Sequence, residues 1–461
     1  MYIYISESNI VKQFYHLILC VAVLASCTTQ NPSFQSSGAI GNHAMVSSAH
    51  PLASAIGLDV MKNGGNAVDA AIATHFALAV VYPQAGNIGG GGFAIIRMND
   101  GTINSLDFRE KAPKLAHREM YLNADGQLND LQSTHGHMAS GVPGAVEGMF
   151  ALHQKYGTLP MSELIQPSIN LAKHGYALTI LAAELLNTKQ GEFQTYNRWS
   201  TPYQSDQNWQ AGDTITQPDL AQTLEYIQTN GVNGFYEGIV ADQIVAEMQS
   251  GNGLISYADL KNYKSVWRKP IIGNYRGHQI ISMAPPSSGG VALIQLLQGT
   301  ENYPIADWGH NSTKTIHLMA ELERRVYADR ATYLGDSDFV DVPVDQLLDS
   351  RYNEQRFSDI SFDKATPSAL VSAGEIPPSE SPETTHLSIA DADGNAVAIT
   401  TTLNSSFGNK VMVKGAGFFL NNEMDDFSSK PGSPNQFGLI GGEANAIAPH
   451  KRMLSSMTPT I

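Results

Sequence analysis

The residues with the clearest capacity for chemistry are the hydroxyl side chains of two short segments, one beginning at Thr384 and one ending near Thr402. Both segments alternate polar and apolar residues, and they flank Asp393-Gly394, a strong signal for a β-hairpin turn. If residues 392–394 form the loop, with the glycine in the left-handed conformation that such loops require, Thr384 lies directly opposite Thr402. Two hydroxyls side by side on a hairpin are candidates for nucleophilic catalysis.

This register gives the hairpin one apolar face and one polar face. The apolar face carries Leu387, Ile389, Val397, Ile399 and Leu403, and the polar face carries Thr384, His386, Ser388, Thr400, Thr402 and Asn404. A solvent-facing ladder of threonine and serine is one explanation of the polar face, because sheets commonly have one. A catalytic surface is the other explanation, and the pattern alone leaves both open.

The composition restricts the classes of function. The chain has 461 residues with 28 Lys+Arg against 43 Asp+Glu, which gives a formal net charge of −15. A protein that binds a polyphosphate backbone needs a clustered cationic surface, so nucleic acid is not an expected partner. No cofactor or metal ion is expected either, because His135 and His137 lack the carboxylate and histidine neighbours of a metal site.

The first 27 residues have the pattern of a targeting segment. Residues 17–25 form an apolar run that is too short to span a bilayer but long enough for a signal peptide. The run leads into Leu-Ala-Ser-Cys27, which resembles a bacterial lipobox, where the cysteine is lipidated. We therefore expect a lipoprotein-type signal peptide over 1–27, a linker over 28–43, and a lipid-anchored protein in the periplasm or on the outer membrane. A buried helix of the mature fold is the alternative.

This interpretation accounts for both cysteines of the chain. Cys20 would be removed with the signal peptide, and Cys27 would be acylated. The mature protein would then have no free thiol, so a nucleophile must be a hydroxyl.

Helices and a glycine-rich turn must position the hairpin. Hydrophobic periodicity predicts helices over 51–62, 67–80, 161–174 and 291–297, and within 219–250. The 67–80 segment is apolar on nearly every side, which indicates a helix buried between layers. Residues 89–92 are four consecutive glycines before a strand-like segment. Because no Walker lysine follows them, close backbone packing is the expected role rather than phosphate binding.

The longest helical pattern covers residues 312–334. One face carries Ile316, Met319, Leu322 and Val326, and the charged residues Glu321, Glu323, Arg324 and Arg325 lie mostly off it. We expect those charges to be solvated. Farther along the chain, residues 363–382 are rich in Pro, Ser and Glu without periodicity, which favours an exposed linker or processing loop.

Seven motifs, in order along the chain, resemble the gamma-glutamyltransferase family. They are residues 64–71, 107–110, 285–290, 383–386, 402–404, 421–427 and 451–457. The resemblance extends from about residue 44 to the last residue. It implies an α/β (α+β) protein with the four-layer αββα sandwich of the N-terminal-nucleophile hydrolases. Region 44–383 would become the large subunit and region 384–461 the small subunit of one domain.

The resemblance also implies a chain that cuts itself between Glu383 and Thr384. The Thr384 hydroxyl would attack the Glu383 carbonyl, and water would then release a chain that begins at Thr384. The freed α-amine has an ordinary pKa near 8, so it can act as a base toward the hydroxyl of its own residue. Thr402 would be the second threonine, hydrogen-bonded to the nucleophile, which agrees with the hairpin register.

The family pattern assigns the carboxylate end of a γ-glutamyl substrate to three residues. Arg109 would bind the α-carboxylate, since a guanidinium binds carboxylates bidentately. Ser455 and Ser456 would add hydroxyl donors. Each has a plainer interpretation: Arg109 as a surface ion pair with Asp107 or Glu110, and the serines as a turn.

The ammonium end is assigned in the same way. Asp426, with Asn404 and Glu423, would hold the α-ammonium group, although acids at a helix start would give the same pattern. Phe437 matches the aromatic residue of the family's lid loop, and such a lid excludes water from the pocket.

The sequence departs from the family pattern near its end. The chain stops at Ile461, and the family's Gly-Gly pair of the oxyanion hole has no match, because Gly289-Gly290 and Gly441-Gly442 do not correspond to it. We therefore expect a sandwich that is incomplete at the C-terminus.

Three functions follow from these patterns. The first is a self-processing γ-glutamyltransferase and glutathione hydrolase, which passes the γ-glutamyl group of glutathione and γ-glutamyl amides to water, amino acids or dipeptides. The second is a glutaryl-type cephalosporin acylase of the same fold, against which Asp426 and Glu423 argue, because their charges would face an apolar chain end. The third is an inactive, envelope-attached remnant.

Overall fold

The structure contains the predicted hairpin and helices together with further strands and helices that the periodicity did not predict. The computed structural model describes residues 38–371 and 384–461. The strands are β1 (Met45–Ser47), β2 (Gly91–Arg97), β3 (Ile103–Asp107), β4 (Tyr176–Ala177), β5 (Thr214–Ile215), β6 (Val266–Arg268), β7 (Ile271–Tyr275), β8 (His278–Ser282), β9 (Thr384–Ala390) and β10 (Ala396–Thr402). The expected signal peptide, Cys27 and Glu383 lie outside the described residues.

The helices include all those that the periodicity predicts. The α-helices are α2 (Pro51–Lys62), α3 (Ala67–Val81), α4 (Asp130–Thr134), α5 (Ala145–Tyr156), α6 (Met161–His174), α7 (Ile180–Tyr196), α8 (Pro218–Asn230), α9 (Asn233–Tyr236), α10 (Gly238–Ser250), α11 (Tyr257–Lys261), α12 (Gly289–Glu301), α13 (Ile305–Trp308), α14 (Thr313–Tyr333), α15 (Val344–Leu347) and α16 (Ser350–Phe357). None of these helices is both long and apolar enough to cross a bilayer.

The main sheet has six strands in the order β1-β9-β10-β2-β3-β6, and every neighbouring pair is antiparallel. The β9–β10 hairpin has the predicted register, with Thr384 opposite Thr402, and Gly394 has the left-handed φ of 88°. The predicted apolar face is buried, because its five residues are at most 3% exposed. A local turn signal therefore placed the two threonines correctly.

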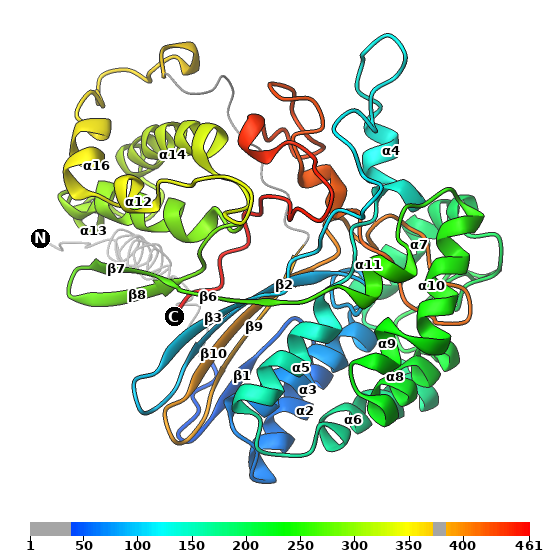
Figure 1. Cartoon of the computed structure of the whole chain (residues 1–461). Coiled ribbons are helices and arrows are strands. Elements are labelled where there is room, and N and C mark those ends of the chain that lie inside the picture. Colours follow the sequence, from blue (N-terminus) through cyan, green and yellow to red (C-terminus); the bar gives the residue numbers. More distant parts are fainter. Residues whose placement is uncertain (1–37, 372–383) are drawn as a thin grey trace, which may run out of the picture. The chain divides into compact units, whose positions relative to one another are not determined.

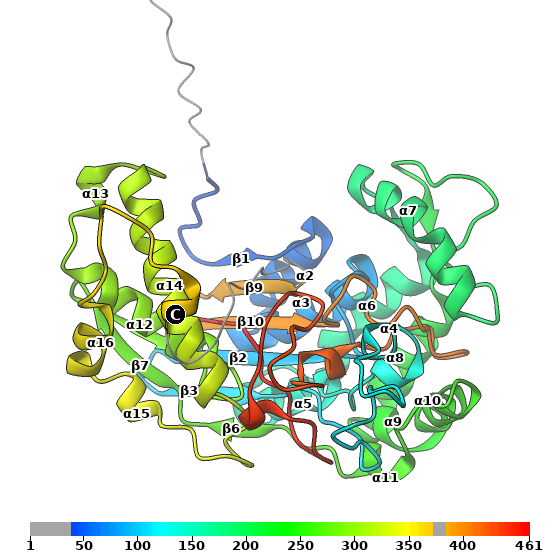
Figure 2. The same cartoon turned by 90° about the horizontal axis from the view of Figure 1, so that it is seen from above.

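Four layers are visible in Figures 1 and 2: α2, α3 and α5, then the six-stranded sheet, then the β7–β8 hairpin, then α12 and α14. Phe93 and Ile95 of β2 pack against Ile281 and Met283 between the two sheets. Burial of this apolar surface holds the sheets together. The arrangement is the expected αββα sandwich.

The first helical layer is fixed by its caps and its apolar surface. All residues of α3 are buried, as the sequence predicted. Asn66 caps the helix in a capping box with Asp69, which satisfies backbone donors that would otherwise be buried without partners. Asp69 also accepts hydrogen bonds from the Thr158 backbone and hydroxyl, which ties α3 to the segment after α5.

The four glycines have the predicted packing role, and two of them pack directly against the hairpin. A Cβ at Gly90 would lie 2.0 Å from the Thr402 carbonyl oxygen, and one at Gly92 would lie 2.2 Å from that of Thr400. The Asn87 side chain spans the same contact by donating to the Thr402 carbonyl at 2.9 Å. The turn therefore sets the position of the end of β10.

The prediction that the charges of the 312–334 helix are solvated is wrong for two of them. Glu321 and Arg325 are 1% and 0% exposed, and Arg325 Nη1 lies 2.7 Å from Glu321 Oε2. Ile316, which we expected on the apolar face, is 55% exposed. Leu322 and Val326 are buried as predicted, and the Glu321–Arg325 pair is buried beside them. Helical periodicity cannot distinguish such a buried ion pair from a solvated one.

Replacing Gly90 with alanine tests the packing against β10. The added methyl group would overlap the Thr402 backbone, so we expect the free energy of unfolding to fall by about 1–3 kcal/mol in urea denaturation. Gly191→Ala is the matched control, because Gly191 lies within α7 with open space around it. That substitution should leave the stability unchanged or raise it by up to ~1 kcal/mol. Equal stability of the two variants would contradict the packing role.

Candidate active site

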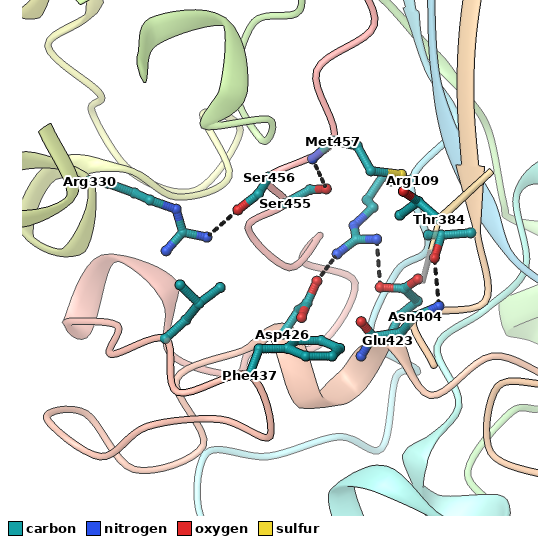
Figure 3. Close-up of a pocket in the computed structure, with 12 residues that line it drawn as sticks. Arg109, Arg330, Thr384, Asn404, Glu423, Asp426, Phe437, Ser455, Ser456 and Met457 are labelled. Atoms are coloured by element: carbon teal, nitrogen blue, oxygen red, sulfur yellow. Dashed lines mark hydrogen bonds and ion pairs between the residues drawn. The ribbon is translucent and has the colours of Figure 1, made fainter. Parts of the chain in front are cut away.

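The predicted site residues line one cavity of about 140 Å³ (Figure 3). The sequence named nine of its lining residues: Arg109, Thr384, Thr402, Asn404, Glu423, Asp426, Phe437, Ser455 and Ser456. It missed three others, which are Arg330, Leu439 and Met457. The cavity therefore collects residues from strand ends, loops and a helix that are hundreds of positions apart in the sequence.

The two threonines lie at neighbouring strand ends. Thr384 is the first residue of β9 and is exposed, whereas Thr402 is the last residue of β10 and is 2% exposed. The Thr402 hydroxyl accepts a hydrogen bond of 2.7 Å from the Asn404 backbone. A hydrogen bond from Thr402 to the Thr384 hydroxyl stays a prediction.

The polar face of the hairpin has two parts. His386 and Ser388 are exposed and hydrogen-bonded to each other at 2.9 Å, as in a surface ladder. Thr400 and Thr402 are buried, and Thr402 reaches the cavity. The surface-ladder explanation thus describes His386 and Ser388, and the catalytic-surface explanation describes the part of the face that contains Thr402.

Asn404 is held in an uncommon backbone conformation. Its φ is 75°, and its side-chain amide donates to the Asn422 carbonyl at 3.0 Å. Asn421 in turn donates to the carbonyls of Gly89 and Gly141, which joins this loop to the glycine-rich turn. A non-glycine residue with positive φ persists only where its surroundings fix it, and such positions are common at functional sites.

Arg109 is the centre of a buried ion cluster. Its Nη1 lies 2.5 Å from Glu423 Oε2 and 3.6 Å from Glu110 Oε2, and its Nη2 lies 2.5 Å from Asp426 Oδ2. The Arg109 side chain is 1% exposed, so the interpretation as a surface ion pair is wrong. One guanidinium thus faces three carboxyl groups.

The backbone of Arg109 is fixed by neighbouring polar groups. Its amide donates to Asp107 Oδ1 at 2.9 Å, and its carbonyl accepts a hydrogen bond of 2.7 Å from Tyr263. Asp107 also binds Arg268 at 2.7 Å and lies 3.3 Å from Arg452 Nε. Because the backbone is held, the guanidinium can reach the cavity only in a narrow range of positions.

Burial raises the pKa values of the carboxyl groups around Arg109. The pKa of Glu110 rises to about 8, and that of Glu423 rises well above its ordinary range. The pKa of Asp426 is raised by the same cause, while Arg109 lowers all three values. Burial thus favours the protonated form of these acids, and a cation bound beside them would lower their pKa values.

Ser455 and Ser456 lie on an extended segment that runs beside residues 281–288. The Ser455 backbone donates to Pro286 and accepts from the Ser288 amide, at 2.9 and 2.7 Å. The Ser456 hydroxyl accepts a hydrogen bond of 3.2 Å from Arg330, which comes from α14. The plainer interpretation of the serines as a turn does not fit this extended segment.

Phe437 lies on a loop that closes over the acidic side of the cavity (Figure 3). The Gln436 amide donates to Asp425 Oδ2 at 3.1 Å, and Asn435 lies 3.4 Å from Asp426 Oδ1. Burial raises the pKa of Asp425 to about 6. The predicted lid is thus in contact with the acids beneath it.

The described part of the chain contains no group of three or more side chains that could hold a metal ion. His137 instead pairs with Glu247 at 3.0 Å.

Comparison with known proteins places the chain in a family. A model of the gamma-glutamyltranspeptidase family matches residues 53–461. The glutathione hydrolase proenzyme of Escherichia coli is 46% identical over 90% of this chain and 72% of its own length. An acylase ACY 1 proenzyme of a Pseudomonas species is 37% identical over 91% of this chain and 74% of its own length.

A solved structure agrees with these sequence matches. The gamma-glutamyltranspeptidase of Helicobacter pylori superposes with a TM-score of 0.70 at 45% identity, covering 75% of this chain and 99% of that one. The family model, the sequence relatives and the solved structure thus agree with one another. The chain belongs to the gamma-glutamyltranspeptidase family of N-terminal-nucleophile hydrolases.

Proposed function

We propose that the protein is a self-processing glutathione hydrolase and γ-glutamyltransferase whose nucleophile is Thr384. The observation that carries the proposal is the content of one cavity. It combines a hydroxyl at a strand start with a guanidinium, two serine hydroxyls and two carboxyl groups. An amino-acid head group carries one charge of each sign, and this cavity offers partners for both.

Self-cleavage comes first in the proposed mechanism. The Thr384 hydroxyl attacks the Glu383 carbonyl carbon, the C–N bond breaks, and the nitrogen of Thr384 takes the hydroxyl proton. Water hydrolyses the resulting ester and leaves a carboxylate on Glu383. The large subunit then ends at Glu383 and the small subunit begins at Thr384, whose free amine can accept the proton of its own hydroxyl.

Acyl transfer uses the same hydroxyl a second time. The Thr384 oxygen attacks the γ-carbonyl carbon of the donor, the amide C–N bond breaks, and the departing amine takes the hydroxyl proton. The γ-glutamyl ester on Thr384 then reacts with water, which gives glutamate, or with the amine of an amino acid or dipeptide, which gives a new γ-glutamyl amide. Thr402, directly opposite Thr384, is proposed to hydrogen-bond the nucleophile.

The head group of the donor is proposed to lie over the ion cluster. Asp426 and Glu423, with Asn404, would hold the α-ammonium, and Arg109 with Ser455 and Ser456 would hold the α-carboxylate. Three carboxyl groups around one guanidinium leave an excess of negative charge once they ionise, so an ammonium group is favoured at this position.

An acylase function is less favoured by the same cavity. A glutaryl group has no α-ammonium, so Glu423 and Asp426 would face a methylene group without a cationic partner from the ligand. The lid over these acids, with Phe437 at the cavity, would enclose the carboxyl groups together with a ligand that offers them no cation.

We also propose that the protein is exported and anchored through a lipid on Cys27. The apolar run and the lipobox-like tetrad support this proposal. In a bacterial host that is fed labelled palmitate, the wild-type chain should become labelled and a Cys27→Ser variant should not. Equal labelling of the two proteins, or label on neither, would contradict it.

Self-cleavage predicts two fragments. Intact-mass measurement and N-terminal sequencing should find a small subunit that begins Thr384-Thr385-His386. Thr384→Ala should stay uncut and lack glutathione hydrolysis, because it has no hydroxyl. Thr384→Ser should still be cut, because the hydroxyl remains. Full glutathione hydrolysis by an uncut chain would refute the mechanism.

The raised pKa values of the carboxyl groups predict a pH dependence of binding. Glu110, Glu423 and Asp426 hold protons at lower pH, and an α-ammonium binds best when they are ionised, so glutamate binding should release protons. Affinity for L-glutamate should therefore rise between pH 6 and 8, by up to about ten-fold per pH unit for each proton released. Titration calorimetry in buffers of different ionisation enthalpy measures this release.

Glutarate is the matched control ligand, because it keeps both carboxylates of glutamate and lacks only the α-ammonium. Its affinity should not rise over the same pH range. A glutamate affinity that is constant or falls from pH 6 to 8 would show that the acids do not face the ammonium.

A further inference from the structure

Arg330 connects the cavity to the helical layer behind it. It lies in the last turn of α14, is 6% exposed, and lines the same cavity as Thr384. Figure 3 shows Arg330 and Thr384 on opposite sides of the Arg109–Asp426 pair. Nothing in the sequence pattern separated this residue from the other charges of the helix.

The guanidinium of Arg330 holds two serine hydroxyls. Its Nε donates to Ser288 Oγ at 2.9 Å, and its Nη2 donates to Ser456 Oγ at 3.2 Å. A guanidinium has no acceptor atom, so both hydroxyl oxygens must be the acceptors. The hydrogen of each hydroxyl is therefore directed away from Arg330.

The hydroxyl groups of Ser288 and Ser456 differ in the acceptors available to them. The Ser288 hydroxyl donates to the Ser455 carbonyl at 2.8 Å, which fixes the backbone beside Ser456. The Ser456 hydroxyl lines the cavity, so its hydrogen is left to donate to a bound group. Arg330 thus sets both the place of Ser456 and the direction in which it donates.

Binding of an α-carboxylate beside Arg109 and Ser456 requires positive charge at that end of the cavity. Both terminal nitrogens of Arg109 are already within 2.5 Å of a carboxylate oxygen, from Glu423 and from Asp426. An anion bound beside Arg109 meets a cation that these acids largely neutralise. A second guanidinium behind Ser456 supplies charge that the Arg109 cluster lacks.

We propose that Arg330 is a positioning residue for the donor, and that it orients the Ser456 hydroxyl toward the α-carboxylate and adds positive charge behind it. The inference rests on the proposed function, because it assumes that a γ-glutamyl group occupies this cavity. A purely structural role is the competing explanation, since Arg330 also ties α14 to the segment that contains Ser456.

Binding of L-glutamate and 4-aminobutyrate distinguishes the two roles. 4-Aminobutyrate keeps the amine and the terminal carboxylate of glutamate but lacks the α-carboxylate. In Arg330→Gln, the affinity for L-glutamate should fall about ten-fold, the usual effect of losing a charge-assisted contact. The affinity for 4-aminobutyrate should change less than about two-fold, because this ligand has no group for Ser456 to bind.

A double-mutant cycle tests whether Arg330 acts through Ser456. In the Ser456→Ala background, Arg330→Gln should weaken glutamate binding less than it does in the wild type, because the shared hydrogen bond is already lost. Arg330→Lys should lie between wild type and Arg330→Gln, since it keeps the charge but not the two-pronged geometry. The matched control is Arg324→Gln on the same helix, which should change neither affinity, because Glu321 keeps its pair with Arg325.

Several outcomes would overturn the inference. They are equal losses for both ligands, equal losses in both serine backgrounds, and no binding of L-glutamate by the wild type. Arg330→Lys also provides a test if Arg330→Gln misfolds. A folded lysine variant with wild-type glutamate affinity would exclude the geometric role of Arg330. Steady-state kinetics on glutathione should show a raised KM with little change in kcat. Glutamate binding without glutathione turnover would instead contradict the proposed function and leave the binding tests valid.

Discussion

The burial of Arg109 is the constraint on which the arrangement of the site depends. A guanidinium that is 1% exposed must be neutralised, and removing one partner of a buried ion pair typically costs about 3–5 kcal/mol. The partners come from segments far apart in the sequence, with Glu110 adjacent and Glu423 and Asp426 more than three hundred residues later. The fold therefore has to bring these acids to the arginine, and the resulting cluster faces the cavity.

A second constraint is steric, and it places the nucleophile. The glycine-rich turn approaches β10 so closely that a single methyl group at Gly90 would overlap the Thr402 backbone. The Asn87 side chain joins the turn to the Thr402 carbonyl, and the Asn421 side chain donates to the Gly89 carbonyl of the turn, so the end of β10 and the 421–426 loop share one support. Since Thr384 pairs with Thr402, the position of the candidate nucleophile depends on this contact as well.

The sequence predicted the parts of the site that local chemistry determines. The Asp-Gly turn with a left-handed Gly394 fixes a register, and that register alone puts Thr384 opposite Thr402. The roles of Arg109 and Asp426 came from family resemblance, because no local pattern distinguishes a buried arginine from a surface one. Arg330 was missed for the same reason: helical periodicity expects charges to be solvated, and its partners Ser288 and Ser456 become neighbours only after folding.

The distribution of charge in the cavity bears on how one fold can serve related acyl groups. Selectivity is strongest where buried polar groups lose their partner when the wrong ligand binds. In the proposed function the acids around Arg109 are in that position, because burial raises their pKa values and a ligand without an ammonium gives them no cation besides Arg109. Under the proposed function, the same cluster that surrounds the buried arginine sets a penalty against ligands without an α-amine. In the proposed function, stability and substrate choice depend on the same ion pairs, so exchanging the carboxyl groups for apolar residues should affect both.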